Sequence, residues 1–320
     1  MRPAGMTSVT VAAALIFALL FSPVFADTKS ADGTKREPKK IDFNDVVESN
    51  PARPERADGP ALKIAVAAMI SPKYTHKYYI ELLNLIGERL GRRVVFVQKK
   101  TYAEVNELLK QKKLDMAFVC SGPYASGKDE FGMEIVAVPV CHGEKVYYSY
   151  FIASRNSGID SLDGLRGKTF AFTDPLSNTG YLVPTYYLAR RNETSESFFK
   201  ETFFTHSHDN SIQAVAEGLA DGAAVDSLIY DFMRTENPGL TEKTVVIEKS
   251  PPYAIPPVVV SSSIAPEIKQ RMKDLFLGIH EDPDGGTILK KLQIERFVEG
   301  NDEDYETVRE LESFLRSKRR

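Results

Sequence analysis

The sequence has no large excess of charge, no spaced set of histidines and no nucleophile elbow, and each absence argues against a class of function. The net charge of −3 over 320 residues argues against nucleic acid as a partner. The pair His206-x-His208 has no metal-ligand spacing, so no metal and no cofactor are predicted. Ser177, His208 and an acid such as Asp209 or Asp226 lack a Gly-x-Ser-x-Gly elbow and an oxyanion-hole loop. We therefore predict that the protein is not an enzyme.

Long apolar runs are also scarce. The one near the start, Val9 to Phe21, is shorter than the ~20 residues that a membrane span needs. It follows a single Arg and precedes Pro23-Val24-Phe25-Ala26, which has small side chains at both recognition positions. Residues 1–26 are therefore predicted to be a secretory signal cleaved after Ala26, which makes the mature protein soluble and periplasmic.

Residues 27–60 are polar, with four prolines among charged residues, and cannot bury enough apolar surface to order themselves. This segment is predicted to be a disordered leader. The composition of the whole chain, 42% hydrophobic and 27% charged, is that of a globular protein large enough for two lobes.

From residue 61 the pattern alternates between strands and helices. Thr101-Tyr102-Ala103-Glu104 is a capping box, which marks one helix start. Alternation of this kind predicts a mostly parallel sheet with ligands at the carboxyl ends of its strands. The predicted strands are 62–69, 94–98, 114–120, 135–140, 148–154 and 169–173. The predicted helices are 71–90, 101–113, 181–191, 265–278, 287–292 and 305–315, with residues 282–286 interpreted as a break between two of them.

The most specific chemistry lies between Asp174 and Pro184. This stretch joins a buried strand to a helix through Ser177, Asn178, Thr179 and a glycine, so main-chain N–H groups and hydroxyls meet at a helix N-terminus. Such a site suits an anion. The alternative is an ordinary turn with Ser177 or Thr179 as the N-cap.

Three motifs resemble a known family. The first motif is Gly167-Lys168-Thr169-Phe170-Ala171-Phe172 followed by Asp174-Pro175-x-Ser177-x-x-Gly180-Tyr181-x-x-Pro184. The second is His208-Asp209 followed by Ala214-Val215-Ala216-x-Gly218-x-x-Asp221-x-Ala223. The third is Lys249-Ser250-Pro251-Pro252 followed by Pro257-Val258-Val259-Val260. In this order they resemble the phosphonate, phosphite and phosphate-binding proteins of ABC importers, the periplasmic PhnD-like family. The resemblance covers about residues 61–300.

The resemblance implies an α/β fold, a type II bilobal periplasmic binding protein whose two α/β lobes are joined by a double-crossover hinge. The expected segments are 61–146 for the first part of lobe 1, 147–251 for lobe 2, and 252–320 for the return to lobe 1. An internal echo supports two similar lobes, since residues 102–119 and 208–225 both follow a helix, turn, Asp-x-Ala and strand pattern. The expected protein is a monomer that delivers a small oxyanion from an interlobe cleft to an ABC permease.

The resemblance also implies a ligand set. Ser177, Asn178 and Thr179 match the positions that hold phosphonate oxygens, although the family usually has a hydroxyl residue where Asn178 stands. His208 matches the family's ligand histidine, and its alternative is a plain loop residue. Tyr102 and Tyr147 match the family's two tyrosines, and the alternative for Tyr147 is a half-buried strand. Apart from the resemblance, Ser71 is a candidate as a helix-terminus donor from lobe 1, and Asp226 is a candidate because it lies near the positions where relatives bind an amine.

Two departures from the family narrow the ligand. Binders of aminoethyl-type phosphonates place carboxylates around the amine, and the corresponding positions here are Leu228 and Pro256, with Asp226 nearby. An apolar pair predicts a ligand without a cationic tail, such as phosphite, phosphate or a short alkylphosphonate.

The two cysteines leave an alternative open. Cys120 stands at the C-terminal end of the strand 114–120 and Cys141 follows the strand 135–140, and in an exported protein two cysteines most often form a disulfide. If they are separate, a cleft thiol at Cys120 suits trivalent arsenic. This resembles an arsenite-sensing branch of the same family, which reports to a histidine kinase through a pocket cysteine.

Overall fold

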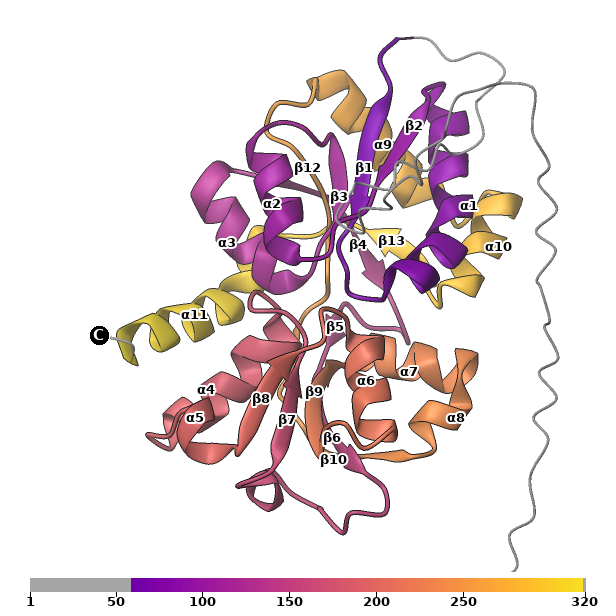
Figure 1. Cartoon of the computed structure of the whole chain (residues 1–320). Helices are drawn as coiled ribbons and strands as arrows, with labels where there is room; N and C mark the ends of the chain where they lie inside the picture. Colours follow the sequence, from indigo (N-terminus) through magenta and orange to yellow (C-terminus); the bar gives the residue numbers. More distant parts are fainter. Residues whose placement is uncertain (1–58, 319–320) are drawn as a thin grey trace, which may run out of the picture. The chain divides into compact units, whose positions relative to one another are not determined.

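Two separate β-sheets organise the chain (Figure 1). The computed structural model describes residues 59–318, so the predicted signal at 1–26 and nearly all of the predicted leader at 27–60 lie outside the described residues. Two α/β lobes, each built around one sheet, confirm the predicted fold class.

Lobe 1 is the part built on a six-stranded mixed sheet. In spatial order its strands are β13 (Arg296–Val298), β4 (Glu134–Val140), β12 (Val258–Val260), β3 (Met116–Phe118), β1 (Leu62–Val66) and β2 (Val94–Val97). In this sheet β1 pairs in parallel with both of its neighbours, β2 and β3. The other three pairs, β3 with β12, β12 with β4 and β4 with β13, are antiparallel. The helices of lobe 1 are α1 (Pro72–Leu90), α2 (Tyr102–Lys110), α3 (Ser121–Phe131), α9 (Pro266–Gly278) and α10 (Pro283–Lys291).

Lobe 2 is built on a five-stranded mixed sheet. Its strands are β10 (Thr244–Lys249), β6 (Ser149–Ser154), β9 (Gly222–Asp226), β7 (Thr169–Phe172) and β8 (Glu201–Phe204). β7 is parallel to β8 and β9, and β6 is antiparallel to β9 and β10. Its helical segments are η1 (Asp163–Leu165), the π-helical turn η2 (Asn178–Leu182), α4 (Val183–Arg190), α5 (Ser195–Phe198), α6 (His208–Ala216), α7 (Ser227–Glu236) and α8 (Pro238–Thr241).

The prediction of mostly parallel sheets is therefore wrong. Parallel pairs occur only at one end of each sheet, among β3, β1 and β2 in lobe 1 and among β9, β7 and β8 in lobe 2, where strands are connected through helices. β6 and β12, which follow the two crossings between the lobes, run opposite to these parallel strands, because each arrives from the other lobe and not through a helix within the same one. β4 follows α3 within lobe 1 and runs in the same direction as β3, and it pairs antiparallel because its neighbours are β12 and β13.

The local signals place most helix starts correctly. The capping box is present, with the Thr101 hydroxyl accepting from the Glu104 N–H, and α1 begins at Pro72 and ends at the left-handed Gly91. The predicted break between two helices exists, but it lies at residues 279–282 and not at 282–286, because Asp282 caps α10 and accepts from the N–H groups of Asp284 and Gly285. Helix α3 was not predicted from the sequence.

Two crossing segments form a small sheet of their own. β5 (Val146–Tyr147) and β11 (Tyr253–Ala254) pair antiparallel, with Tyr147 opposite Tyr253, where the chain passes between the lobes. Above and below this pair lie the two main sheets (Figure 1).

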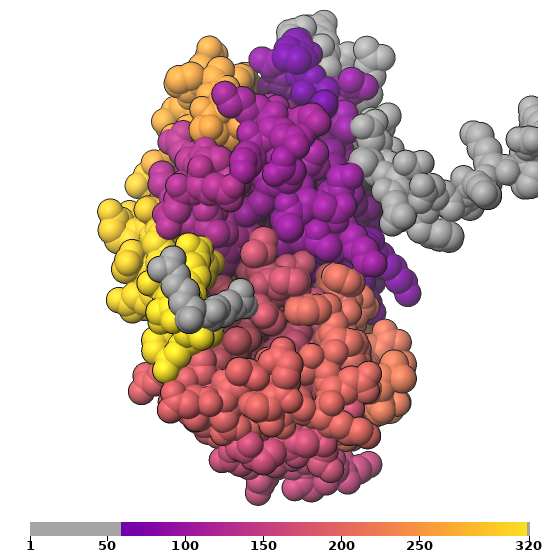
Figure 2. Space-filling model, turned by 60° about the vertical axis from the view of Figure 1, so that its left-hand side comes forward, coloured from indigo at the N-terminus to yellow at the C-terminus, as the bar shows by residue number. Residues whose placement is uncertain are grey.

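A C-terminal helix lies across both lobes. A 3-10 turn, η3 (Asp302–Tyr305), leads into α11 (Glu306–Lys318), which packs on α3 of lobe 1 and α4 of lobe 2. Its apolar face contributes Val308, Leu311 and Leu315 to a buried cluster with residues of both lobes. In the space-filling view the yellow helix covers the junction of the two lobes (Figure 2).

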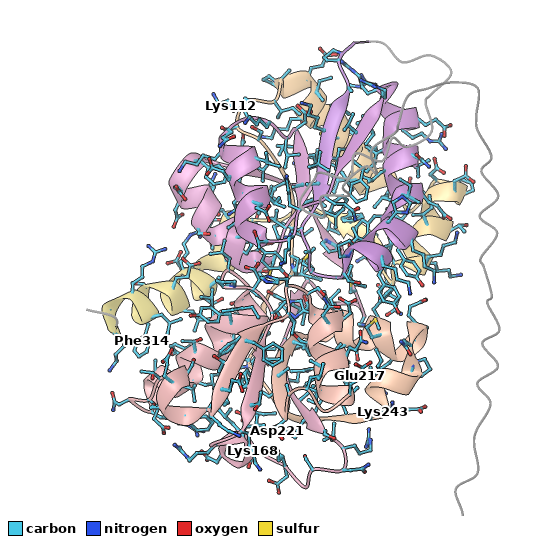
Figure 3. The ribbon with its side chains drawn as sticks, in the orientation of Figure 1. Lys112, Lys168, Glu217, Asp221, Lys243 and Phe314 are labelled. Carbon is cyan, nitrogen blue, oxygen red and sulfur yellow. The ribbon has the colours of Figure 1, made fainter. Side chains whose placement is uncertain are left out.

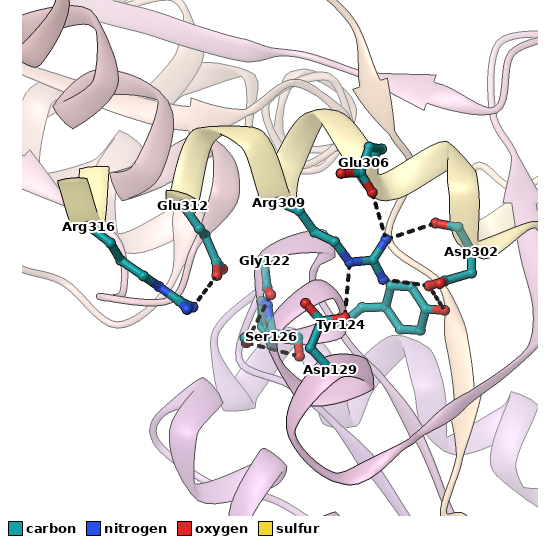
Figure 4. Close-up of polar contacts among 10 residues, drawn as sticks. Gly122, Tyr124, Ser126, Asp129, Asp302, Glu306, Arg309, Glu312 and Arg316 are labelled. Carbon is teal, nitrogen blue, oxygen red and sulfur yellow. Dashed lines mark hydrogen bonds and ion pairs between the residues drawn. The ribbon is translucent and has the colours of Figure 1, made fainter. Parts of the chain in front are cut away.

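One arginine fixes the start of α11. The Arg309 guanidinium contacts the carboxylates of Asp302 at 2.6 Å, Asp129 at 3.1 Å and Glu306 at 3.6 Å (Figure 4). The Tyr124 hydroxyl donates to Asp302 at 2.7 Å, so the network joins α11 to α3. Only 16% of the Arg309 side chain is exposed.

Candidate functional site

Several helix N-termini converge where the lobes meet. Tyr102 is the first residue of α2, His208 of α6 and Asn178 of η2, while Cys120 is the N-cap of α3. The N-terminus of a helix carries unsatisfied N–H groups and a partial positive charge. All four of these residues, together with Ser177, Thr179 and Tyr147, are completely buried. The junction is therefore a polar interior with an electropositive bias, which we call the polar cluster.

Ser177 and His208 form the centre of the polar cluster. The Ser177 hydroxyl accepts from the Gly180 N–H at 3.0 Å, so Ser177 is the N-cap of η2, and it lies 3.4 Å from His208 Nε2. His208 Nδ1 accepts from the Asp226 main-chain N–H at 3.0 Å. Because that bond makes Nδ1 an acceptor, the ring proton of the neutral imidazole is on Nε2. His208 thus presents an N–H donor on the side of Ser177.

Burial keeps that imidazole neutral. It lowers the pKa of His208 to about 3, so the ring stays uncharged at neutral pH. The Thr173 hydroxyl lies 3.1 Å from His208 Nδ1, a neighbour that the sequence did not point to although Thr173 directly follows β7. A Cβ on Gly180 would lie 2.4 Å from Thr173 Oγ1 and 3.0 Å from His208 Cε1. Glycine is therefore needed at position 180 for η2 to approach His208.

Asn178, Tyr147 and Cys120 form a second group. Asn178 Nδ2 donates to the Tyr147 hydroxyl at 3.2 Å, and that hydroxyl lies 3.7 Å from Cys120 Sγ. Burial raises the pKa of Cys120 to about 11, even though hydrogen bonds from the Asn178 and Gly122 main chain favour the thiolate. The thiol is therefore protonated at neutral pH.

Three buried polar atoms of the polar cluster have no hydrogen-bond partner among residues 59–318. They are the Tyr102 hydroxyl, Thr179 Oγ1 and Asn178 Oδ1. Thr179 is otherwise held in place, since its carbonyl accepts from the Ser149 hydroxyl at 2.7 Å. An unsatisfied buried polar group costs about 1–3 kcal/mol, so these three atoms would be stabilised by hydrogen bonds from a ligand or from ordered water.

The electrostatics of this interior do not depend on cations. No Lys or Arg is among the buried residues of the described range. Charged side chains such as Lys112, Lys168, Glu217 and Lys243 lie at the outer ends of the lobes, far from the junction (Figure 3). An anion in the polar cluster would be held by N–H and O–H dipoles.

Asp226 lies beside the polar cluster. Its carboxylate caps α7, accepting from the Leu228 N–H at 2.7 Å, while its own N–H donates to His208. Burial raises the pKa of Asp226 to about 7. The imidazole of His208 is therefore oriented by the main-chain N–H of Asp226, because the carboxylate is bonded to α7 instead.

Main-chain hydrogen bonds join the lobes around the polar cluster. The Tyr102 N–H donates to Asp174 Oδ2 at 3.1 Å, and the His208 N–H to the Met69 carbonyl at 3.0 Å. The Ser71 N–H donates to Asp209 Oδ1 at 2.8 Å, so in this structure the α1 N-terminus is occupied by a carboxylate of lobe 2. Asp174 was not among the predicted site residues, and its position two residues after the end of β7 was the available signal.

A separate cavity of about 100 Å³ lies between the lobes. Of the predicted site residues, only Asp226 lines it. The rest of its wall is mostly hydrocarbon and includes Leu228 and Pro256, the two positions at which the sequence departs from the aminoethyl binders. Cys141 also lines this cavity, and Cys120 does not.

The side chains considered for catalysis and for metal binding are arranged as follows. Both cysteines are free thiols. Ser177 and His208 are within reach of each other, but neither candidate acid, Asp209 or Asp226, gives His208 a carboxylate hydrogen bond in the described range. Within residues 59–318 no group of three His, Cys, Asp or Glu side chains could hold a metal, and no helix is long and apolar enough to cross a membrane.

The chain is similar to known binding proteins. A family model described as the periplasmic substrate-binding protein of the phosphonate ABC transporter matches residues 64–305. The phosphonates-binding periplasmic protein of Escherichia coli is 26% identical over 270 residues, which cover 83% of this chain and 79% of that one. The phosphate-import protein PhnD of Mycolicibacterium smegmatis is 27% identical over 238 residues, covering 70% and 71%.

The fold of this chain is similar to that of solved binding proteins. The binding protein of an ABC phosphonate transporter from Pseudomonas aeruginosa superposes with a TM-score of 0.77 at 26% identity, covering 82% of this chain and 88% of that one. PhnD1 from Prochlorococcus marinus, solved with methylphosphonate, gives a TM-score of 0.74 at 19% identity, with coverage of 80% and 98%.

Proposed function

This chain belongs to the periplasmic substrate-binding proteins of phosphonate ABC transporters, and on that premise we propose that it captures a small tetrahedral oxyanion in the polar cluster. The ligand class is phosphite, phosphate or a short alkylphosphonate. The names of the relatives span this class, since they include binders of phosphonate, phosphate and phosphite.

The observation that carries the proposal is a buried set of donors without a buried cation. A tetrahedral oxyanion needs several N–H and O–H donors around it, and preorganised dipoles hold its charge with little reorganisation. Ser177, His208 Nε2 and the unpartnered hydroxyls of Tyr102 and Thr179 are such donors. The anion would supply the missing partners of those hydroxyls.

The remaining predicted residues have supporting roles in this proposal. Asn178 and Tyr147 would donate from the hinge side, where they are already hydrogen-bonded to each other. Asp226 would orient His208 through its main chain. The Ser71 N–H is bonded to Asp209 and would contribute to closure and not to the anion.

Uptake follows from opening and closing of the lobes. The polar cluster is completely buried, so an anion can enter only when the lobes separate, and its binding favours the closed form. The closed monomer would then dock on the membrane permease of an ABC importer. The proposal includes export to the periplasm by the signal at residues 1–26, cleaved after Ala26.

Isothermal titration calorimetry tests the proposal directly. Purified protein should bind at least one of phosphite, phosphate and methylphosphonate, and Ser177→Ala or His208→Ala should each weaken binding by about 1–3 kcal/mol. His76→Ala, at an exposed histidine, is the matched control for His208 and should bind as the wild type does. Unchanged affinity in both site variants would place the anion elsewhere.

The arsenite alternative is favoured by one observation, the free Cys120 thiol within the polar cluster. Against it, Cys120 is protonated and Cys141 lines a different cavity, so a second thiol is not supplied to the same centre. Titration with arsenite compares the two hypotheses. Tight arsenite binding that is lost in Cys120→Ser, with no binding of phosphorus oxyanions, would favour the sensor.

A further inference from the structure

We propose that the 100 Å³ cavity receives an uncharged hydrocarbon tail, so that the preferred ligand is an alkylphosphonate with about three or four carbons. This inference rests on the proposed function, because the phosphonate head would occupy the polar cluster. It makes the ligand neither a bare inorganic oxyanion nor an aminoalkylphosphonate.

The cavity wall is apolar and comes from both lobes. Lobe 1 contributes Tyr79, Phe118 and Pro256, and lobe 2 contributes Leu228 and Phe232 from or near α7. A dry apolar cavity of about 150 Å³ holds a benzene molecule of six carbons. By the same ratio, a cavity of about 100 Å³ holds roughly four carbons.

The cavity adjoins the polar cluster, because two residues of its wall are hydrogen-bonded to His208. Asp226 lines the cavity with its side chain and donates its N–H to His208. Met69 lines the cavity and accepts the His208 N–H at its carbonyl. The cavity and the polar cluster are therefore neighbours, since residues of the cavity wall contact His208 directly.

A cationic tail has poor partners in this cavity. Asp226 is the only carboxylate among its lining residues, and because its Oδ1 already accepts two N–H bonds at the start of α7, only its Oδ2 is left to accept from an ammonium group. The rings of Tyr74 and Tyr78 already have lysine ammonium groups over them, at 5.8 and 4.5 Å from the ring centroids. An ammonium group would lose its hydration without gaining a comparable set of acceptors.

The test is a calorimetric comparison of matched ligands. n-Butylphosphonate should bind about tenfold or more tightly than methylphosphonate, since each buried methylene contributes about fourfold and ordering of the tail offsets part of this. n-Propylphosphonate and 2-aminoethylphosphonate have the same number of heavy atoms, and the propyl compound should bind more tightly.

A variant pair locates the effect. Leu228→Phe adds volume to the cavity wall and should reduce the ratio of butyl to methyl affinity to about one. Leu219→Phe makes the same exchange at a side chain that is 66% exposed and should keep the wild-type ratio.

The outcomes separate the two proposals. Binding of methylphosphonate with no gain for the butyl compound, tighter binding of 2-aminoethylphosphonate than of the propyl compound, or an unchanged ratio in Leu228→Phe would each overturn the tail inference alone. Failure of every phosphorus oxyanion to bind would overturn the proposed function and the inference together.

Discussion

Replacing Gly122 with alanine should weaken ligand binding by obstructing closure of the lobes. Gly122 is in the first turn of α3 in lobe 1, and the Leu176 carbonyl of lobe 2 lies against it. A Cβ at Gly122 would lie 2.2 Å from the Leu176 oxygen and 3.2 Å from the Asn178 nitrogen. Both neighbours are backbone atoms, so they cannot rotate away as a side chain could.

The magnitude follows from the overlap. A carbon to oxygen contact of 2.2 Å must open by about 1 Å, and forcing extra volume into a packed contact typically costs about 1–3 kcal/mol. If closure bears this cost, the dissociation constant rises by about 5- to 150-fold. In the open protein the same substitution favours α3, because alanine is better than glycine within a helix by about 1 kcal/mol.

Calorimetry with the tightest phosphorus oxyanion, together with thermal unfolding of the ligand-free protein, measures both effects. Gly278→Ala is the matched control, since Gly278 is also a helical glycine and its Cβ would meet nothing within 4 Å. The control should gain a little stability and bind normally. Gly122→Ala that binds like the wild type at unchanged stability would refute the reasoning.

Three further results are expected. Burial raises the pKa of Asp226 from 3.8 to about 7, so Asp226 lowers the stability of the fold as the pH rises from about 4 to 7. His208, whose pKa is lowered from 6.5 to about 3, has the opposite effect and raises the stability as the pH rises from about 3 to 6.5. In Asp226→Asn the melting temperature should therefore increase more steeply with pH than in the wild type, and parallel curves would contradict the assignment. Arg309→Ala should lower the free energy of unfolding by about 1–2 kcal/mol, measured by denaturant unfolding. The control Arg316→Ala, at a side chain that is 73% exposed, should lower it by less than about 0.5 kcal/mol, and equal losses would show that Arg309 contributes no more than an exposed arginine. In the absence of reductant, a thiol reagent should react with two thiols after unfolding and with none before it, because Cys120 and Cys141 are buried and their pKa values are raised to about 11 and 12. A count of no reactive thiols in the unfolded protein would show that the two cysteines form a disulfide.

Much of the fold could be predicted because its signals are local. The capping box at Thr101 and the positions of Pro72 and Gly91 act within one turn of the chain, and the structure has each of them in its expected role. The missed helix α3 has only a weak apolar pattern, with two glycines and a proline in Ser121–Phe131. Its position is fixed instead by packing against α2 and α11, which a local pattern does not contain.

The site could be predicted only in part for the same reason. The structure brings His208 next to the consecutive residues Ser177, Asn178 and Thr179, which the family motifs place on a different element from His208. The tautomer of His208 depends on the Asp226 N–H, a bond across two elements that spacing alone could not indicate. The cavity likewise arises from side chains of both lobes.

The β5–β11 pair restricts how the halves of the molecule can move. Sliding one crossing past the other would break the hydrogen bonds between Val146–Tyr147 and Tyr253–Ala254, whereas bending the pair as one ribbon keeps them. The pairing therefore favours a motion in which the two crossings bend together. Tyr147 lies in this ribbon and its hydroxyl accepts from Asn178 of lobe 2, so a ligand contact at Tyr147 would couple the polar cluster to the segment that bends.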